Sequence, residues 1–155
     1  MPAVEHGNPG QRTGPGVGDP PGFDLQNCAT QRNLSVVGRE EARRLGSALK
    51  QLGIPVAAVR SSRLCRRLDT VRLAFGDVQP WPALDNTFDT PERRTQQMYE
   101  IRKTLAQPVT GGNLALITHD VNILALTGIS PAEIELVAIR TGRDGKFTVV
   151  GRRIP

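Results

Sequence analysis

Apolar residues recur at helical spacing in four stretches of the chain, which predict helices over 36–52, 64–75, 91–105 and 120–126. Residues with known preferences for helix ends bound two of them. Ser35 is placed to accept a hydrogen bond from the first turn of the first helix, and Gly53 allows the chain to leave it. Thr90 is expected to cap the third helix, with Pro91 at its first position.

Short apolar runs between these helices predict strands. VAAV at 56–59 and NLALIT at 113–118 have the length and composition of buried strands, whereas VQPWPAL is extended and ambiguous. ELVAIR, TGRDGK and FTVVGR predict a hairpin at the end of the chain. Helices that alternate with strands are typical of parallel sheets. The order therefore predicts an α/β fold, a three-layer sandwich with a mostly parallel sheet and a C-terminal antiparallel hairpin at the edge.

Residues 1–33 have a different composition. Glycine and proline crowd GNPGQRTGPGVGDPPGF, which can hold neither a helix nor a central strand. A loop of this length in a compact protein is either functional or disordered. We expect a single domain over 1–155, with 1–33 as its Gly/Pro-rich N-terminal segment and active-site loop.

The amino-acid composition limits the kinds of partner that the protein is expected to bind. The 155 residues carry a formal net charge of +5, which favours anionic partners. Aromatic residues make up only 4%, too few for the stacking surfaces that bind single-stranded nucleic acid, and basic residues are interleaved with acidic ones, as in GREEARR. No apolar run reaches the length of a membrane span and no signal peptide is recognisable, so no membrane partner and a cytoplasmic location are expected as the chain is written. A periplasmic or secreted location stays open if the true N-terminus is missing.

Polar side chains follow the first predicted strand, where ligands bind in open α/β sheets. They are Arg60, Ser61, Ser62, Arg63, Arg66 and Arg67. Guanidinium groups match phosphate oxygens, and Ser62 with the following helix N-terminus adds donors. The plain alternative is a solvated helix face. Arg66 is the best candidate for phosphate binding because it lies on the side of Ser62, whereas Arg67 is expected to face solvent.

A second candidate group, His119 with Asp120, follows the second strand. The alternatives are a hydrogen-bonded structural histidine and an aspartate that caps the next helix. The other histidine, His6, lies in AVEHGNPG. Two histidines without a cysteine cluster argue against a zinc site, and we expect neither a metal nor a cofactor.

Three segments, LSVVGREEARRLG, SSRLCRRLDT and THD with NILALTG, lie in order between residues 28 and 128. Together they resemble the histidine phosphatase superfamily, the phosphoglycerate mutase-like phosphohydrolases. The resemblance implies the sandwich fold and a phosphohistidine mechanism on a small phosphorylated substrate. The family's Arg-His-Gly motif, at the end of a central first strand, corresponds to Glu5, His6 and Gly7.

The same resemblance implies the roles of the site residues. His6 would be the nucleophile that attacks phosphorus, Arg66 would bind the phosphoryl oxygens, and His119 would donate to them. Asp120 would protonate the leaving oxygen, a role that Glu92 or Glu100 fills in the alternative family pattern. Neither Glu92 nor Glu100 lies in a motif of this sequence. Arg12 is a further guanidinium that the loop could bring to the substrate.

Two departures from the family pattern leave alternatives open. Glu5 stands where the family has arginine, and only Met1–Val4 precede it. The chain start is trimmed or wrong, or the protein is an impaired member that binds phosphate compounds, or the EHG match is accidental and 1–33 is disordered. We rank a phosphomonoester hydrolase first, an impaired phosphate-ligand-binding or regulatory protein of the same fold second, and a basic nucleic-acid binder last.

The two cysteines, Cys28 and Cys65, are too few for a disulfide scaffold. Two separate thiols are the ordinary expectation for an intracellular protein. Cys65 directly precedes Arg66, and Cys28 lies at the exit of the long loop, so we predict that the two approach each other near the pocket. A bridge between them would clamp the loop. The oligomeric state is left open.

Overall fold

The computed structural model describes residues 4–5, 18–132 and 134–155. Its centre is a parallel sheet with the strand order β4-β3-β5. The strands are β3 (Val56–Ser61), β4 (Gln79–Pro80) and β5 (Asn113–Ile117). In the register of β3 and β5, Ser61 lies opposite Ile117. Both strands therefore end at the same level, which brings the residues that follow them together.

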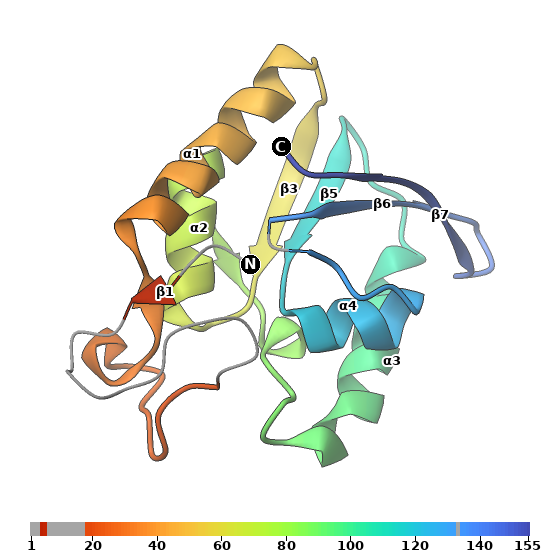
Figure 1. Cartoon of the computed structure of the whole chain (residues 1–155). Helices are drawn as coiled ribbons and strands as arrows, with labels where there is room; N and C mark the ends of the chain where they lie inside the picture. The colour runs from red at the N-terminus through yellow and green to blue at the C-terminus, as the bar shows by residue number, and fades with distance from the viewer. Residues whose placement is uncertain (1–3, 6–17, 133) are drawn as a thin grey trace.

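Helices α1 (Val36–Gln51) and α2 (Cys65–Phe75) lie together on one side of β3 and β5 (Figure 1). The Ser35 side chain accepts a hydrogen bond from the Gly38 N–H at 3.0 Å, as predicted for the start of α1. The two helices approach closely at Gly46, where an added Cβ atom would lie 2.1 Å from the carbonyl oxygen of Ala74. Gly46 is thus required by helix packing.

Helices α3 (Arg94–Leu105) and α4 (Asp120–Thr127) lie on the other side of the sheet (Figure 1). A buried cluster that joins α3 to the 3-10 turn η2 (Pro82–Leu84) fills the space beneath them. Its members are Ala83, Leu84, Ile101 and Leu105, with Met98 packed against them. The apolar positions whose spacing predicted the third helix therefore form its buried face.

The start of the third helix differs from the prediction. Residues Pro91–Arg93 form a 3-10 turn, η3, and the α-helix begins only at Arg94. The Thr90 side chain makes no capping hydrogen bond. Pro91 therefore begins a tight 3-10 turn, and the regular α-helix follows directly after it.

The hairpin of β6 (Leu136–Thr141) and β7 (Phe147–Arg153) forms a sheet of its own beside the parallel one (Figure 1). A cavity of about 160 Å³ lies between β5 and β6, lined by Leu116 and Leu136 among others. In the described part of the chain, no strand pairs with the second edge of β5. Together, the two helix layers and the sheet confirm the predicted sandwich.

Strand β1 (Val4–Glu5) does not lie in the parallel sheet. It pairs antiparallel with β2 (Asn33–Leu34), with Val4 opposite Leu34. The central first strand that the resemblance implies is thus not formed by these two residues. Among the described residues, no helix is long and apolar enough to cross a membrane.

A disulfide joins Cys28 to Cys65 across 37 positions of sequence. Cys28 begins the 3-10 turn η1 (Cys28–Thr30), and Cys65 is the first residue of α2. The Cys65 N–H also donates to the Gln31 Oε1 at 2.8 Å. The prediction that the two cysteines approach each other is confirmed, and the bridge fastens the loop before β2 to the start of α2.

We expect Gly46→Ala to lower the free energy of unfolding by about 1–3 kcal/mol, because the new methyl group overlaps a backbone carbonyl. Ser47→Ala, one position along the exposed face, should change it by less than about 0.5 kcal/mol. Urea denaturation of both variants measures this. Equal stabilities for the two would contradict the close packing of α1 on α2.

Replacing both Cys28 and Cys65 by serine should lower the free energy of unfolding by about 2–4 kcal/mol, because the closed loop no longer restricts the unfolded chain. A dithiol reductant should destabilise the wild-type protein by a similar amount and leave the double variant unchanged. Two titratable thiols in denatured protein, isolated from its native compartment without reductant, would rule the bridge out.

Candidate active site

His119 and Ser62 meet where β5 and β3 end. The Ser62 N–H donates to the carbonyl of Ile117 at 3.0 Å, which ties the two strand ends together. The Nε2 atom of His119 lies 2.9 Å from the Ser62 Oγ, and both side chains are completely buried. The sheet register thus holds the histidine in one orientation.

The hydrogen bonds around Ser62 assign the tautomer of His119. The Ser62 hydroxyl donates to the Asp85 Oδ1 at 3.3 Å and accepts from the Leu64 N–H at 3.3 Å. Because its single proton is then used, the Nε2–H of His119 donates to Ser62. The Nδ1 lone pair remains, and among the described residues this buried atom has no hydrogen-bond partner.

Asp85 was not a candidate from the sequence, yet it organises the loop after β3. Its carboxylate accepts from the backbone N–H of Arg63 at 2.8 Å, and from the Nε and Nη2 atoms of that residue at 2.8 and 2.6 Å. Asp85 contacts Ser62 and not the imidazole. The three side chains therefore do not form a Ser-His-Asp relay, in which the carboxylate binds the histidine.

The arginines of the segment after β3 divide into two groups. Arg63 is paired with Asp85, and Arg60 stacks over the Trp81 ring at 5.0 Å from its centroid. Both are used in structural contacts. Arg66 and Arg67, in the first turn of α2, are buried, with exposed fractions of 3% and 5%. These two form the candidate anion site.

The expectation that Arg67 faces solvent is wrong. The helical pattern of α2 alone places it outward, but Arg67 lines the cavity between β5 and β6 together with residues of α1 and β5, such as Ala42 and Ile117. The Nε atom of Arg67 is buried and has no hydrogen-bond partner among the described residues. A buried guanidinium nitrogen without an acceptor is costly, and it marks a place where an anion fits.

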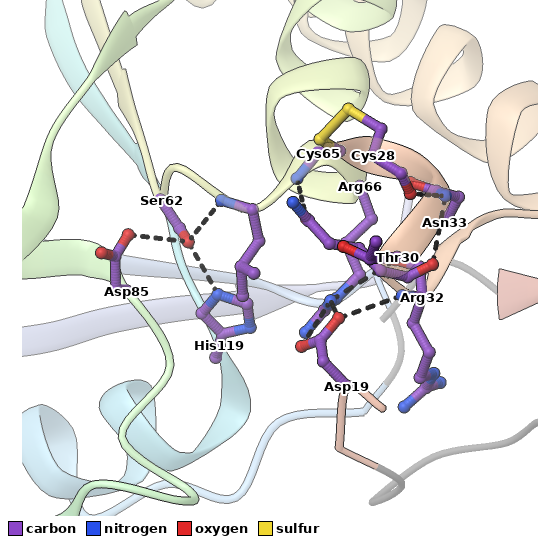
Figure 2. Close-up of polar contacts among 12 residues, drawn as sticks. Asp19, Cys28, Thr30, Arg32, Asn33, Ser62, Cys65, Arg66, Asp85 and His119 are labelled. Atoms are coloured by element: carbon purple, nitrogen blue, oxygen red, sulfur yellow. Dashed lines mark hydrogen bonds and ion pairs between the residues drawn. A yellow bond between two sulfur atoms is a disulfide. The ribbon is translucent and has the colours of Figure 1, made fainter. Parts of the chain in front are cut away.

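Arg66 has a partner that the sequence did not suggest. Its Nη1 atom lies 2.7 and 3.0 Å from the two carboxylate oxygens of Asp19 (Figure 2). The backbone N–H of Arg32 donates to the Asp19 Oδ1 at 3.0 Å. The side chains of Arg66 and Asp19 are 3% and 2% exposed, so this ion pair is almost completely removed from water.

Burial and like charges shift the pKa values of the cluster. Burial and, next, the charge of Arg66 lower the pKa of Arg67 to about 9, while the carboxylates of Asp120 and Asp19 act in the opposite direction. Burial, followed by the charges of Arg67 and Arg66, lowers the pKa of His119 well below 6.5. At neutral pH the site therefore holds two cationic guanidiniums beside a neutral imidazole.

The remaining candidates are placed as follows. His6 and Arg12 lie outside the described residues, and so does the side chain of Glu5. Asp120 is the first residue of α4, and His119 holds the capping position in its place. Asp120 lines the cavity between β5 and β6 together with Arg67.

Among the described residues, neither alternative acid makes a hydrogen bond or an ion pair with the cluster. Glu92 is exposed in η3, and Glu100 accepts a hydrogen bond from Gln96 on the surface of α3. The described residues contain no group of three or more side chains suited to a metal ion.

The fold is that of the histidine phosphatases, as the sequence resemblance implied. The chain is similar to the protein histidine phosphatase SixA complexed with tungstate, with a TM-score of 0.55 and 16% identity over 78% of this chain and 83% of that one. It is similar also to a SixA protein from Agrobacterium tumefaciens, with a TM-score of 0.54 and 17% identity over 98% and 92%. No family model matches the sequence, and no curated protein matches it significantly.

The depressed pKa of His119 predicts a pH-dependent stability. Because the folded-state pKa lies below the unfolded value of 6.5, the unfolded chain binds more protons as the pH falls through that range. The contribution of neutral His119 to the free energy of unfolding is fully present above about pH 6.5. Below that pH it is lost, by at most about 1.4 kcal/mol per pH unit.

The variant His119→Asn should lack this loss while keeping an N–H donor for Ser62. Urea denaturation of both proteins at pH 7.5 and pH 5 measures the difference, since carboxylates that titrate in both cancel in the comparison. An identical pH dependence for the two would show that His119 is not held neutral.

Proposed function

We propose that the protein is a phosphatase that hydrolyses a phosphomonoester through a phosphohistidine intermediate. The observation that carries this proposal is a pair of buried nitrogen atoms, Arg67 Nε and His119 Nδ1, which have no hydrogen-bond partner among the described residues and lie beside the guanidinium of Arg66. Cationic groups beside a neutral imidazole suit a phosphoryl group, which brings oxygens to each of them.

In the proposed reaction, a neutral imidazole nitrogen of His6 attacks phosphorus, and the bond from phosphorus to the leaving oxygen breaks as the P–N bond forms. Asp120 acts in its protonated form and donates that proton to the leaving oxygen. Water then attacks the phosphohistidine, Asp120 takes up the proton of that water, and His6 and phosphate are regenerated. Arg66 and Arg67 neutralise the charge on the equatorial oxygens.

Two of the earlier assignments change within this proposal. Ser62 was a candidate for phosphate binding, but its hydroxyl is already engaged by three groups, so we assign it the positioning of His119. His119 begins neutral and takes up a proton when the phosphoryl group arrives, which lets Nδ1–H donate to one oxygen. Arg12 stays a proposed additional cation.

The SixA neighbours suggest a second class of substrate for the same chemistry, the phosphohistidine of a protein. The alternative function is an impaired phosphate-binding or regulatory protein. A specific contact favours it, since Asp19 already pairs with the arginine that would bind phosphate. We also propose that the protein works in an oxidising compartment, because a disulfide such as Cys28–Cys65 persists under such conditions.

Release of phosphate from an aryl phosphate tests the proposed function. We expect turnover by the wild-type protein, a loss of more than about 10³-fold in His6→Ala, and a loss of about 10²–10³-fold in His119→Asn. Arg72→Gln, on the exposed side of α2, is the matched control and should retain full activity.

Two outcomes decide against this assignment. Turnover that survives His6→Ala would remove His6 as the nucleophile. A folded wild-type protein without turnover on aryl phosphates or on phosphohistidine would favour the impaired binder.

A further inference from the structure

We propose that the carboxylate of Asp19 occupies the position of the phosphoryl group, so that the segment 18–34 blocks the site in the resting protein. This inference rests on the proposed function, because it concerns the same anion site. It adds a regulatory role for a residue that neither the sequence motifs nor the mechanism assigned.

The geometry of Asp19 is that of a bound oxyanion. Two oxygens face the Nη1 atom of Arg66 at 2.7 and 3.0 Å, and one of them also accepts the backbone N–H of Arg32 at 3.0 Å (Figure 2). A guanidinium nitrogen and a main-chain N–H are the donors that proteins use for phosphate. Both charged side chains are buried, so a substrate oxygen reaches Arg66 only after Asp19 withdraws.

The charges of the cluster explain why a carboxylate lies there. The pKa of Arg67 responds to the charge of Asp19, which partly offsets the effects of burial and of Arg66. Two adjacent buried guanidiniums without a counter-ion are strongly unfavourable, because the attraction that compensates their desolvation is missing. Asp19 supplies the counter-charge in the empty site, and an arriving phosphoryl group supplies it in the occupied site.

The attachments of the segment allow its two ends to behave differently. The end near Arg32 is fastened by the Cys28–Cys65 disulfide and by the hydrogen bond from the Cys65 N–H to Gln31. The end that carries Asp19 has no such covalent attachment, and Gly22 provides a positive φ of 73° between the two. Withdrawal of Asp19 therefore leaves the Arg32 N–H and Arg66 in place to receive the substrate.

Binding of tungstate, a non-hydrolysable phosphate analogue, tests the proposal by calorimetry. We expect Asp19→Asn to bind tungstate at least tenfold more tightly than the wild-type protein, because no carboxylate competes for Arg66. Asp24→Asn is the matched control, since Asp24 lies on the same segment and accepts from the Gln26 N–H, whereas Asp19 is the carboxylate that pairs with Arg66. Its affinity should equal that of the wild type.

Thermal denaturation provides a second readout of the same substitution. Asp19→Asn should melt at a lower temperature than the wild type without ligand and gain more from added tungstate, as expected for a site that has lost its internal counter-ion. Equal or weaker tungstate affinity in Asp19→Asn, or no tungstate binding by either protein, would overturn the proposal.

A crystal structure of the wild-type protein with tungstate keeps the test decisive if Asp19→Asn fails to fold. Tungstate on Arg66 with the Asp19 side chain moved away supports the blockade, and tungstate elsewhere with the Asp19–Arg66 pair intact overturns it.

Hydrolysis of an aryl phosphate distinguishes failure of the proposed phosphatase function from failure of the proposed blockade by Asp19. Tighter tungstate binding by Asp19→Asn without turnover in any variant sinks the phosphatase alone, whereas wild-type turnover with unchanged tungstate affinity sinks the blockade alone.

Discussion

Burial of two neighbouring arginines in the first turn of α2 is the constraint on which the site depends. Arg66 and Arg67 are nearly inaccessible to water, and the charge of Arg66 lowers the pKa of Arg67. Such a pair is stable only with anions at hand. Asp19 supplies one such anion through its ion pair with Arg66. Asp120, at the start of α4, supplies a second negative charge near Arg67. The disulfide beside Arg66 then secures the segment that brings Asp19 to the cluster.

The parallel register of β3 and β5 meets a second requirement, a histidine that is both buried and oriented. Ser61 opposite Ile117 places Ser62 and His119 side by side, and Asp85 fixes the serine hydroxyl. The imidazole is kept neutral by burial and by the two arginines. A neutral imidazole between cations contributes no further repulsion, so the cluster tolerates it in the absence of ligand.

Local patterns in the sequence predicted the parts of the structure that depend on local forces. The periodicity of Ile101 and Leu105 and the capping side chain of Ser35 follow from one helix each, and both are confirmed. Arg67 was misjudged because its burial depends on its packing beside α1 and β5, which are distant in the sequence. Asp19 was missed for the same reason, since nothing within GVGDPPGF indicates a partner that lies 47 positions away. The disulfide is a long-range contact that did have a sequence signal, the two cysteines beside the predicted pocket.

Exchange of Asp19 for a phosphoryl group would change the charge of the cluster in a definite direction. A carboxylate brings one negative charge, whereas a phosphomonoester at neutral pH brings nearly two. The extra negative charge beside His119 favours its protonated form, which opposes the effects of burial and of the arginines. Protonated Nδ1 then has an acceptor in the ligand, so the buried atom that lacks a partner among the described residues gains one in the occupied site. A blocking carboxylate and a neutral histidine are in this sense two halves of one electrostatic arrangement, because either feature alone would leave the buried arginines with the wrong charge balance in one of the two states.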